Sequence, residues 1–313
     1  MGTDMNKYIL ITGNRSSGKT SAARMLAERY GCGYRDISDL ITDDYAQSAH
    51  SIPMTRNDAH AVAHSPAGRV RLYNWAVDRC DGAGDPAYWI KHALAVDGVR
   101  IVSGVRRAEE FAAGRYLFNL HVHIDRLAAV AQDDDFVVSV DHKPMWLVND
   151  GNLEALGEWG AKRVEKELAK PECYICGRYR HFKADGSFDD EIMDMEHEEE
   201  RFWADIAFKA GYRVFSPIGI HAALDHVFDG KRIIDLCCER VKRMSSADVL
   251  LLRAGWDWFP ASEGAVAEFS HAGDRSVHVI HTEMGAGKAY KALVNWKEKL
   301  HHDRAKIGAA VPG

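Results

Sequence analysis

The sequence predicts an α/β protein with two domains, each built on a parallel sheet that helices cover. Short apolar runs of strand length alternate with segments of helical periodicity, which indicates βαβ units and therefore parallel strands. The chain has 313 residues, more than one small core uses, and the strand–helix pattern begins again after Pro171. We therefore expect one domain at residues 1–170 and a second at residues 171–313.

In the first domain, β-branched and apolar runs predict strands at residues 7–12, 34–37, 99–105 and 117–124. Apolar residues at helical spacing predict helices at residues 20–30, 68–78, 87–96, 108–115 and 153–168. Residues 43–65 are polar and irregular, and we assign no element to them.

In the second domain, the same criteria predict strands at residues 173–177, 212–215, 248–253 and 276–280. They predict helices at residues 198–210, 233–245 and 264–271. Residues 183–190 are polar and loop-like, and residues 288–309 form a polar helical tail.

Composition favours a cytoplasmic protein that acts on small molecules. The net charge is -6 and no long Lys/Arg run is present, so we expect neither nucleic acid nor membrane as a partner. Six cysteines are scattered along the chain, which suits a reducing compartment. Cys173-x-x-Cys176 is compatible with zinc or redox chemistry, but the adjacent pair Cys237–Cys238 has poor spacing for a shared zinc site. We interpret these cysteines as buried thiols.

Residues 13–20, with the sequence GNRSSGKT, fit the P-loop pattern G-x-x-x-x-G-K-[ST] at every fixed position. The motif follows a predicted strand and opens a predicted helix, as a phosphate cradle requires. Lys19 is then the catalytic cation on the β- and γ-phosphates of ATP, and Thr20 is the Mg²⁺ ligand. The cofactor-binding residues expected from the motif are Gly13, Ser16, Ser17, Gly18, Lys19 and Thr20.

Four further segments follow the P-loop: RDISDL at 35–40, GR at 68–69, DPAYW at 85–89 and IVSGVRR at 101–107. With the P-loop, they resemble phage-type deoxynucleoside monophosphate kinases over about residues 7 to 165. This resemblance implies ATP-dependent phosphoryl transfer to a deoxynucleoside monophosphate. One departure is Gly104, where the family has an Asp, and Asp36 or Asp39 offers a carboxylate to magnesium or the acceptor in its place. The alternative that the P-loop binds a nucleotide without transferring a phosphoryl group stays open.

Three arginines are candidates to neutralise the charge of the transferring phosphate, because phosphoryl transfer depends mainly on positioning and cations. They are Arg69, Arg106 and Arg126.

The second half carries CYICGRYR at 173–180, ADVLLL at 247–252, GW at 255–256 and SEGAVAE at 262–268. These segments, in this order, resemble the nucleoside 2-deoxyribosyltransferase superfamily, which includes the deoxynucleoside 5′-monophosphate N-glycosidases. The resemblance covers about residues 172 to 283 and implies a Rossmann-like sheet. It also implies that Glu268 is the nucleophile, that Tyr174 orients it, and that the second domain forms a homodimer.

Further residues of this domain are candidates for substrate contact. Ser262 and Gly264 near a helix start, with Gly177 and Arg178, suit a phosphate or a sugar hydroxyl. We count Asp248 among the catalytic candidates as a contact to the sugar, with capping of its strand as the alternative. The superfamily often has an Asp eight residues before Asp248, and Arg240 occupies that position here. Glu239 or Asp235 would then substitute for the missing Asp. The alternative is that the domain only binds a nucleotide.

The sequence thus predicts a bifunctional enzyme of deoxynucleotide metabolism, with ATP and Mg²⁺ as cofactors and a deoxynucleoside monophosphate or nucleoside as substrate. The alternative is a nucleotide sensor with one or both sites inactive, which Gly104 and Arg240 favour. A third hypothesis is a kinase that acts on the ends of nucleic acids, which would share the P-loop. The net negative charge of the chain disfavours it, because nucleic acids are also negatively charged. The base, and the choice between hydrolysis and base exchange, stay open.

Overall fold

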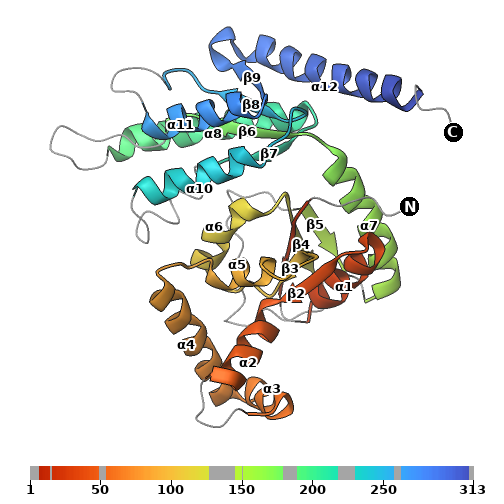
Figure 1. The fold of residues 1–313 in the computed structure, drawn as a ribbon. Helices are drawn as coiled ribbons and strands as arrows, with labels where there is room; N and C mark the ends of the chain where they lie inside the picture. The colour runs from red at the N-terminus through yellow and green to blue at the C-terminus, as the bar shows by residue number, and fades with distance from the viewer. Residues whose placement is uncertain are drawn as a thin grey trace. The chain divides into compact units, whose positions relative to one another are not determined.

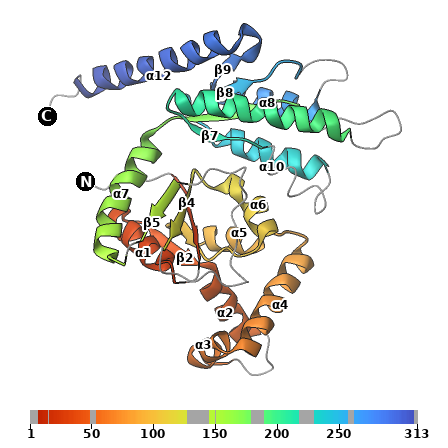
Figure 2. The same cartoon turned by 180° about the vertical axis from the view of Figure 1, so that it is seen from behind.

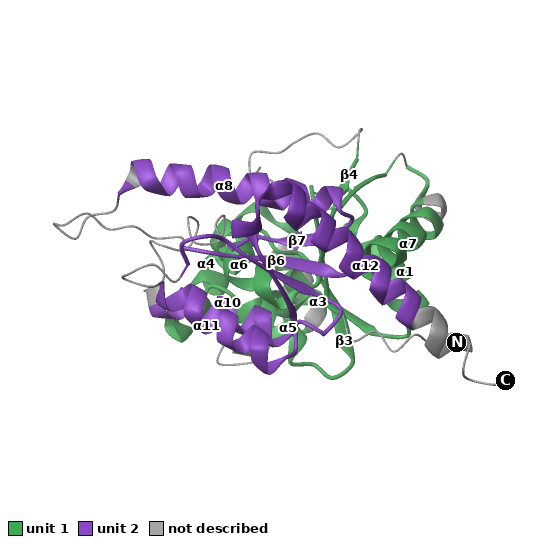
Figure 3. Ribbon diagram, turned by 90° about the horizontal axis from the view of Figure 1, so that it is seen from above, with its two compact units in different colours: residues 1–168 green, residues 169–313 purple. Residues whose placement is uncertain are grey.

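The computed structural model describes residues 7–14, 16–48, 54–126, 145–149, 151–178, 189–217, 230–256 and 262–309. The chain divides into two compact units, Met1–Leu168 (unit 1) and Ala169–Gly313 (unit 2), which Figure 3 colours separately. Each is an α/β unit whose described strands pair in parallel. Among the described helices, none has the length and apolar character needed to cross a membrane.

The sheet of unit 1 has the strand order β2-β3-β1-β4-β5. Its strands are β1 (Ile9–Gly13), β2 (Gly33–Asp36), β3 (Val99–Ser103), β4 (Leu120–Asp125) and β5 (Met145–Val148). Ile9 pairs with Ile101 of β3 on one side and Leu120 of β4 on the other. Because all five strands run the same way, the residues that follow them meet at one edge of the sheet.

Alternation along β1 divides the core of unit 1 into two layers. Ile9 and Ile11 face α1 (Lys19–Tyr30) and α7 (Leu153–Ala169). Leu10 faces the opposite layer, which α2, α4, α5 and α6 supply. These helices are α2 (Ile37–Ser48), α4 (Pro66–Ala83), α5 (Tyr88–Leu94) and α6 (Ala108–Gly114). Both faces of the sheet are therefore covered, as a parallel sheet requires.

The segment left unassigned at residues 43–65 is the main error of the fold prediction, because it contains the end of α2 and all of α3 (Arg56–His64). Helix α3 begins at the cap residue Thr55, whose Oγ1 accepts a hydrogen bond of 3.2 Å from Asp58 N. Ser65 caps α4 in the same way, accepting from Gly68 N at 3.0 Å. Both views in Figures 1 and 2 show α2, α3 and α4 extending beyond the sheet of unit 1.

Unit 2 has the strand order β7-β6-β8-β9. The strands are β6 (Glu172–Cys176), β7 (Arg213–Phe215), β8 (Val249–Leu252) and β9 (His278–His281). One face packs on α8 (Asp190–Lys209) and α12 (Ala286–Ala309). On the other side, α11 (Glu263–Asp274) contacts β6 and β8 and packs against α10 (Gly230–Lys242). The predicted loop at 183–190 lies mostly outside the described residues, and α8 begins at Asp190 rather than at 198.

The polar tail at 288–309 is helical, and the structure gives it a packing role. Ala289 and Leu293 of α12 are fully buried in the core of unit 2. The hydroxyl of Tyr212 donates a hydrogen bond of 2.8 Å to the carbonyl of Leu293. The apolar face of α12 therefore covers the sheet, while its polar residues face outward.

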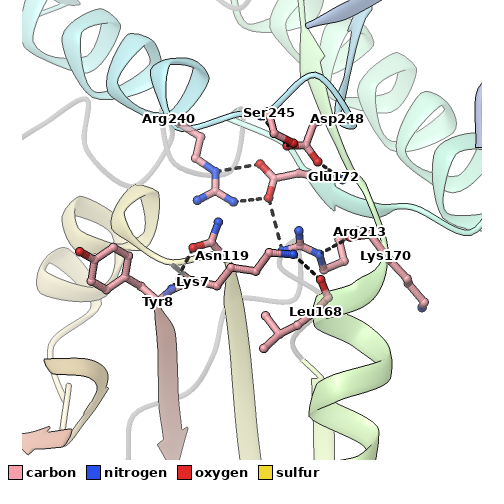
Figure 4. A network of polar contacts seen from close by, with 10 residues as sticks. All are labelled: Lys7, Tyr8, Asn119, Leu168, Lys170, Glu172, Arg213, Arg240, Ser245 and Asp248. Atoms are coloured by element: carbon pink, nitrogen blue, oxygen red, sulfur yellow. Dashed lines mark hydrogen bonds and ion pairs between the residues drawn. The ribbon is translucent and has the colours of Figure 1, made fainter. Parts of the chain in front are cut away.

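A buried ion-pair network lies at the amino-terminal edge of the second sheet (Figure 4). Arg240 binds the Glu172 carboxylate through two nitrogens, with Nε at 2.9 Å from Oε1 and Nη2 on Oε2. Arg213 Nη1 lies 3.6 Å from the same carboxylate, and the Arg240 guanidinium also stacks 5.0 Å from the Phe215 ring centroid. Arg240 is thus a structural residue that neutralises Glu172.

We expect Arg240→Ala to lower the free energy of unfolding of unit 2 by about 3–5 kcal/mol, because it leaves the buried Glu172 carboxylate without its bidentate partner. Urea unfolding followed by circular dichroism measures this. Lys242→Ala is the matched control on the same helix, since it removes only the exposed pair with Glu239. Equal unfolding midpoints for the two variants would contradict the assignment.

Candidate functional site

The P-loop connects β1 to α1 through backbone conformations that favour glycine. Gly13 has φ +151°, and a Cβ there would lie 2.2 Å from the carbonyl oxygen of Ile124. Gly18, at φ +95°, is the N-cap of α1. Gly13 therefore allows the loop to lie close to β4, and Gly18 allows the chain to turn into α1. Arg15 lies outside the described residues.

The loop is held through its carbonyl groups. Lys19 Nζ donates to Asn14 O at 3.1 Å, and Arg126 Nη1 donates to Ser16 O at 3.1 Å. Asn149 Nδ2 donates to Ser17 O at 2.7 Å. The N–H group of Ser17 also donates to Asn14 O, at 3.1 Å. These contacts fix the course of the loop, whose other N–H groups would bind an anion.

A pocket of about 350 Å³ opens beside the loop, within the size range of nucleotide and cofactor sites. Arg126 lies at this pocket together with the P-loop, and its role in neutralising phosphate stays a prediction. The sequence analysis missed the contribution of Asn149 and Gly151, because it did not predict β5, which they follow. The pocket is lined by Ser16, Gly18, Lys19, Thr20, Ser21, Arg126, Asn149 and Gly151.

Asp36 lies at the end of β2, beside the P-loop threonine. Thr20 Oγ1 donates to Asp36 Oδ2 at 3.2 Å, and Ser103 Oγ donates to the same oxygen at 2.8 Å. A Cβ at Gly104 would lie 2.4 Å from Asp36 Oδ1, and Gly104 has φ +88°. The Asp36 carboxylate therefore occupies the space beside residue 104, where the resemblance places a different Asp.

A hydroxyl beside a carboxylate is the donor set that Mg²⁺ uses when it is bound together with nucleotide phosphates. Thr20 and Asp36 fit this requirement. Among the described residues, no group of three or more His, Cys, Asp or Glu side chains is arranged to hold a metal ion by itself.

The other predicted phosphate and acceptor residues of unit 1 do not line this pocket. Asp39 is exposed on α2, and Arg106 is exposed in the turn after β3. Arg69 lies in the first turn of α4. Their predicted role in acceptor binding stays a prediction.

The second candidate site centres on Glu268, which α11 buries to 1% exposure. Burial raises the pKa of Glu268 to about 7, and the neighbouring side chains of Cys176, Tyr174 and Cys237 act in the opposite direction. The oxygen Oε2 has no hydrogen-bond partner among the described residues. Glu268 is thus a buried carboxyl group with uncharged neighbours, and its pKa is shifted toward neutral pH.

The remaining residues predicted here have local structural roles. Ser262 is the N-cap of α11, and its Oγ accepts a hydrogen bond of 3.4 Å from Ala265 N. A Cβ at Gly264 would lie 3.2 Å from Ile234 of α10, so this glycine permits close helix packing. A Cβ at Gly177 would lie 2.8 Å from the Arg253 side chain. Arg178 is half-buried after β6.

Asp248 requires a correction, because the structure does not bring it to Glu268. Its Oδ1 accepts from Glu172 N at 2.7 Å, and its Oδ2 accepts from the amide and hydroxyl of Ser245, both at 2.8 Å. Asp248 precedes β8 and lies at the amino-terminal edge of the sheet (Figure 4). Of the two roles considered for it, the contacts fit capping of the strand, and we remove it from the catalytic set.

Arg253 is a buried residue at the carboxyl edge that the sequence analysis did not single out. It follows β8, is 1% exposed, and its backbone N–H donates to Cys176 O at 2.8 Å. Three glutamates of α8 surround its guanidinium: Glu196 at Nη2, Glu199 at 2.8 Å and Glu200 at 3.8 Å. The sequence does carry a signal for this buried arginine. Arg253 directly follows an apolar strand, and an acidic helix elsewhere in the domain offers it partners.

The comparisons with known proteins leave both family resemblances as predictions. No protein-family model matches the sequence. No curated protein matches it either. Among solved structures, the chain is similar to an unliganded sugar kinase from a Janibacter species, with 15% sequence identity and a TM-score of 0.28 over 50% of this chain and 91% of that one. A likeness this weak carries no argument for fold or function.

Gly104→Ala tests the packing of Asp36. We expect a loss of about 1–2 kcal/mol of unfolding free energy from left-handed strain, and a further loss of about 1–3 kcal/mol because the new methyl group displaces the buried Asp36 carboxylate. The control is Gly98→Ala. Gly98 has φ +76°, and a Cβ there would have no atom within 4 Å, so this variant introduces backbone strain without a clash. Chemical denaturation measures both, and equal losses would contradict the contact.

The raised pKa of Glu268 predicts a pH dependence of stability. A carboxyl whose folded pKa exceeds its ordinary value of 4.5 stabilises the fold fully below about pH 4.5 and loses that contribution as the pH rises through 7. Relative to Glu268→Gln, which stays neutral, the wild-type protein should lose on the order of 3 kcal/mol between those pH values. Urea unfolding at several pH values measures the difference. The exposed Glu263→Gln on the same helix should follow the wild type, and a pH-independent gap for Glu268→Gln would contradict the shift.

Proposed function

We propose that the protein is a bifunctional enzyme of deoxynucleotide metabolism. Unit 1 would transfer the γ-phosphoryl group of ATP to a deoxynucleoside monophosphate. Unit 2 would break or exchange the bond between a base and its deoxyribose. The observation that carries the proposal is the pairing of Thr20 with the Asp36 carboxylate beside the P-loop, since it supplies the acid that Gly104 lacks.

The residues of unit 1 suit phosphoryl transfer, in which the protein mainly positions charges. Lys19 would neutralise the β- and γ-phosphates, and Arg126 would add a second cation at the pocket. Thr20 and Asp36 would hold Mg²⁺, and the ion would supply positive charge beside the phosphates. The acceptor is proposed from the resemblance of the segments at 35–40, 68–69, 85–89 and 101–107.

The residues around Glu268 suit attack on a sugar carbon. In this reaction the carboxylate bonds to C1′ as the C1′–N bond breaks, and the base leaves with the bonding electrons and then takes a proton. Attack on C1′ by water, or by a second base, then releases the carboxylate. With a pKa of about 7, Glu268 is partly ionised at neutral pH, so a nucleophilic fraction is present. A homodimer through unit 2 belongs to the same proposal.

The alternative of a nucleotide sensor rested on two departures from the family patterns, and each has a local physical account. Gly104 leaves room for Asp36, and Arg240 pairs with Glu172 at the edge of the sheet opposite to strand ends such as Cys176. Neither departure therefore argues for a lost activity. Binding without turnover is one outcome of the experiment below.

Product analysis by chromatography and mass spectrometry tests both activities. The protein is incubated with each deoxynucleoside monophosphate, with and without ATP–Mg²⁺. Diphosphate formation should fall by about 100-fold or more in Lys19→Ala, and by about 10- to 100-fold in Asp36→Asn. The exposed Asp97→Asn, which lies just before β3 and has no predicted role, is the matched control for Asp36→Asn.

Release of free base should fall by more than about 1000-fold in Glu268→Gln and persist in Lys19→Ala. Glu263→Gln on the same helix controls for the loss of a carboxylate. If no monophosphate gives a product while calorimetry shows nucleotide binding, the sensor replaces this proposal.

A further inference from the structure

One asparagine at the pocket of unit 1 joins three separate parts of the chain. Asn149 directly follows β5, and its backbone N–H donates to the carbonyl of Asp125, the last residue of β4, at 2.7 Å. Its side-chain Nδ2 donates to Ser17 O of the P-loop at 2.7 Å. The carboxamide oxygen Oδ1 accepts from Gly151 N at 2.9 Å. Asn149 therefore connects the end of the sheet, the P-loop and the segment that leads to α7.

The bond between Asn149 and the P-loop is shielded from water. Asn149 is 2% exposed and Ser17 is fully buried. Water cannot readily take the place of a donor that is lost at such a position, so the bond is costly to break. Arg126, the other residue outside the loop that holds it, binds Ser16 O through an exposed hydrogen bond of 3.1 Å. Of these two contacts, the one from Asn149 is therefore the one that solvent cannot replace.

The bond to Ser17 O also sets the direction of the next backbone N–H group. A trans peptide is planar, so the Ser17 carbonyl and the Gly18 N–H point in opposite directions. With the carbonyl held by Asn149, the Gly18 N–H points away from the carboxamide. Gly18 lines the pocket and is the N-cap of α1. At the start of a helix, the backbone N–H groups and the helix dipole both favour an anion.

We propose that Asn149 is a positioning residue for phosphate binding, which orients the Ser17–Gly18 peptide so that the Gly18 N–H donates to a phosphate of the nucleotide. The inference rests on the proposed binding of ATP by unit 1. Asn149 acts through the peptide and does not itself have to touch the nucleotide. Its backbone bond to Asp125 fixes it against the end of β4, where Arg126 is the next residue.

Two substitutions separate this role from a role in holding the connection to α7. Aspartate has nearly the shape of asparagine, and its carboxylate still accepts from Gly151 N but has no donor for Ser17 O. Alanine removes both bonds. If the bond to Ser17 matters for the P-loop, the two variants should have similar effects there. If only the bond to Gly151 matters, alanine alone should have an effect.

Asn119 offers a matched control at the opposite edge of the same sheet. It lies just before β4, its Oδ1 accepts from Tyr8 N at 2.9 Å, and its own N–H donates to Tyr8 O at 2.8 Å. Asn119→Ala therefore also removes an asparagine side chain that bonds to the backbone of a neighbouring segment. Tyr8 precedes β1, whereas the P-loop follows it, so any general loss of stability is tested away from the pocket.

The first measurement is amide hydrogen exchange of the full-length protein without nucleotide, followed by mass spectrometry of fragments that cover residues 13–20. Ser17 N–H donates to Asn14 O at 3.1 Å, so its exchange reports whether the loop keeps its course. Asn149→Ala and Asn149→Asp should speed this exchange by about 10- to 100-fold, because a buried carbonyl loses its donor. Asn119→Ala should leave it unchanged.

The second measurement is calorimetric titration with ATP and Mg²⁺. Asn149→Ala should weaken ATP binding by about 10- to 100-fold, and Asn119→Ala should bind ATP as the wild type does. Unchanged ATP affinity in Asn149→Ala overturns the inference, and so does faster exchange in Asn149→Ala without faster exchange in Asn149→Asp. If Asn149→Ala does not fold, exchange in the isosteric Asn149→Asp decides, and wild-type protection of the loop there overturns the inference.

The outcomes also separate this inference from the proposed function. ATP binding that depends on Asn149, without formation of a diphosphate, supports the positioning role and rejects the kinase reaction. Diphosphate formation with the same ATP affinity in wild type and Asn149→Ala rejects the positioning role and leaves the reaction standing. A wild-type protein that binds no ATP rejects both.

Discussion

The parallel pairing of the described strands determines where chemistry is possible in each unit. In a parallel sheet, all carboxyl ends meet at one edge, and the connections that leave them provide the functional side chains. In unit 1, Asp36 is the last residue of β2, Arg126 follows β4, and Asn149 follows β5, and each of them contacts the P-loop or the helix after it. These residues are far apart in the sequence, and the shared strand direction brings them together.

The two edges of the second sheet treat buried charge differently. At the amino-terminal edge, Glu172 is neutralised by Arg240 and Arg213, which makes a closed structural network. On the other side, the buried Glu268 has the uncharged side chains of Cys176, Tyr174 and Cys237 beside it instead of a cation, and burial raises its pKa to about 7. A structural carboxylate gains most from a permanent ion pair, whereas a reacting carboxylate must be able to change its bonding. This contrast is the physical reason for assigning chemistry to Glu268 and not to Asp248 or Glu172.

The strands and helices rich in large apolar residues could be predicted from the sequence, and elements with few such residues could not. Helix α3 consists of small and polar residues, with Val62 as its only large apolar residue, although Thr55 and Asp58 carry a capping signal. Strand β5 has four residues, and Trp146 and Val148 on its outer face are about half exposed. The P-loop and the Glu268 segment were visible because their residue spacing is local. The contacts of Asp36, Arg253 and Cys237 depend on neighbouring elements, which no sequence spacing reveals.

The relation between Asp36 and Gly104 shows why a departure from a sequence motif has to be judged in three dimensions. Strands β2 and β3 are neighbours, and Asp36 pairs with Ser103 in their register. A side chain at residue 104 would therefore enter the space that the Asp36 carboxylate occupies. With Asp36 in place, residue 104 has a positive φ and a Cβ position only 2.4 Å from Oδ1, so glycine is the residue that fits. Gly104 is thus explained by the position of Asp36 and is no sign by itself that a carboxylate is missing beside Thr20.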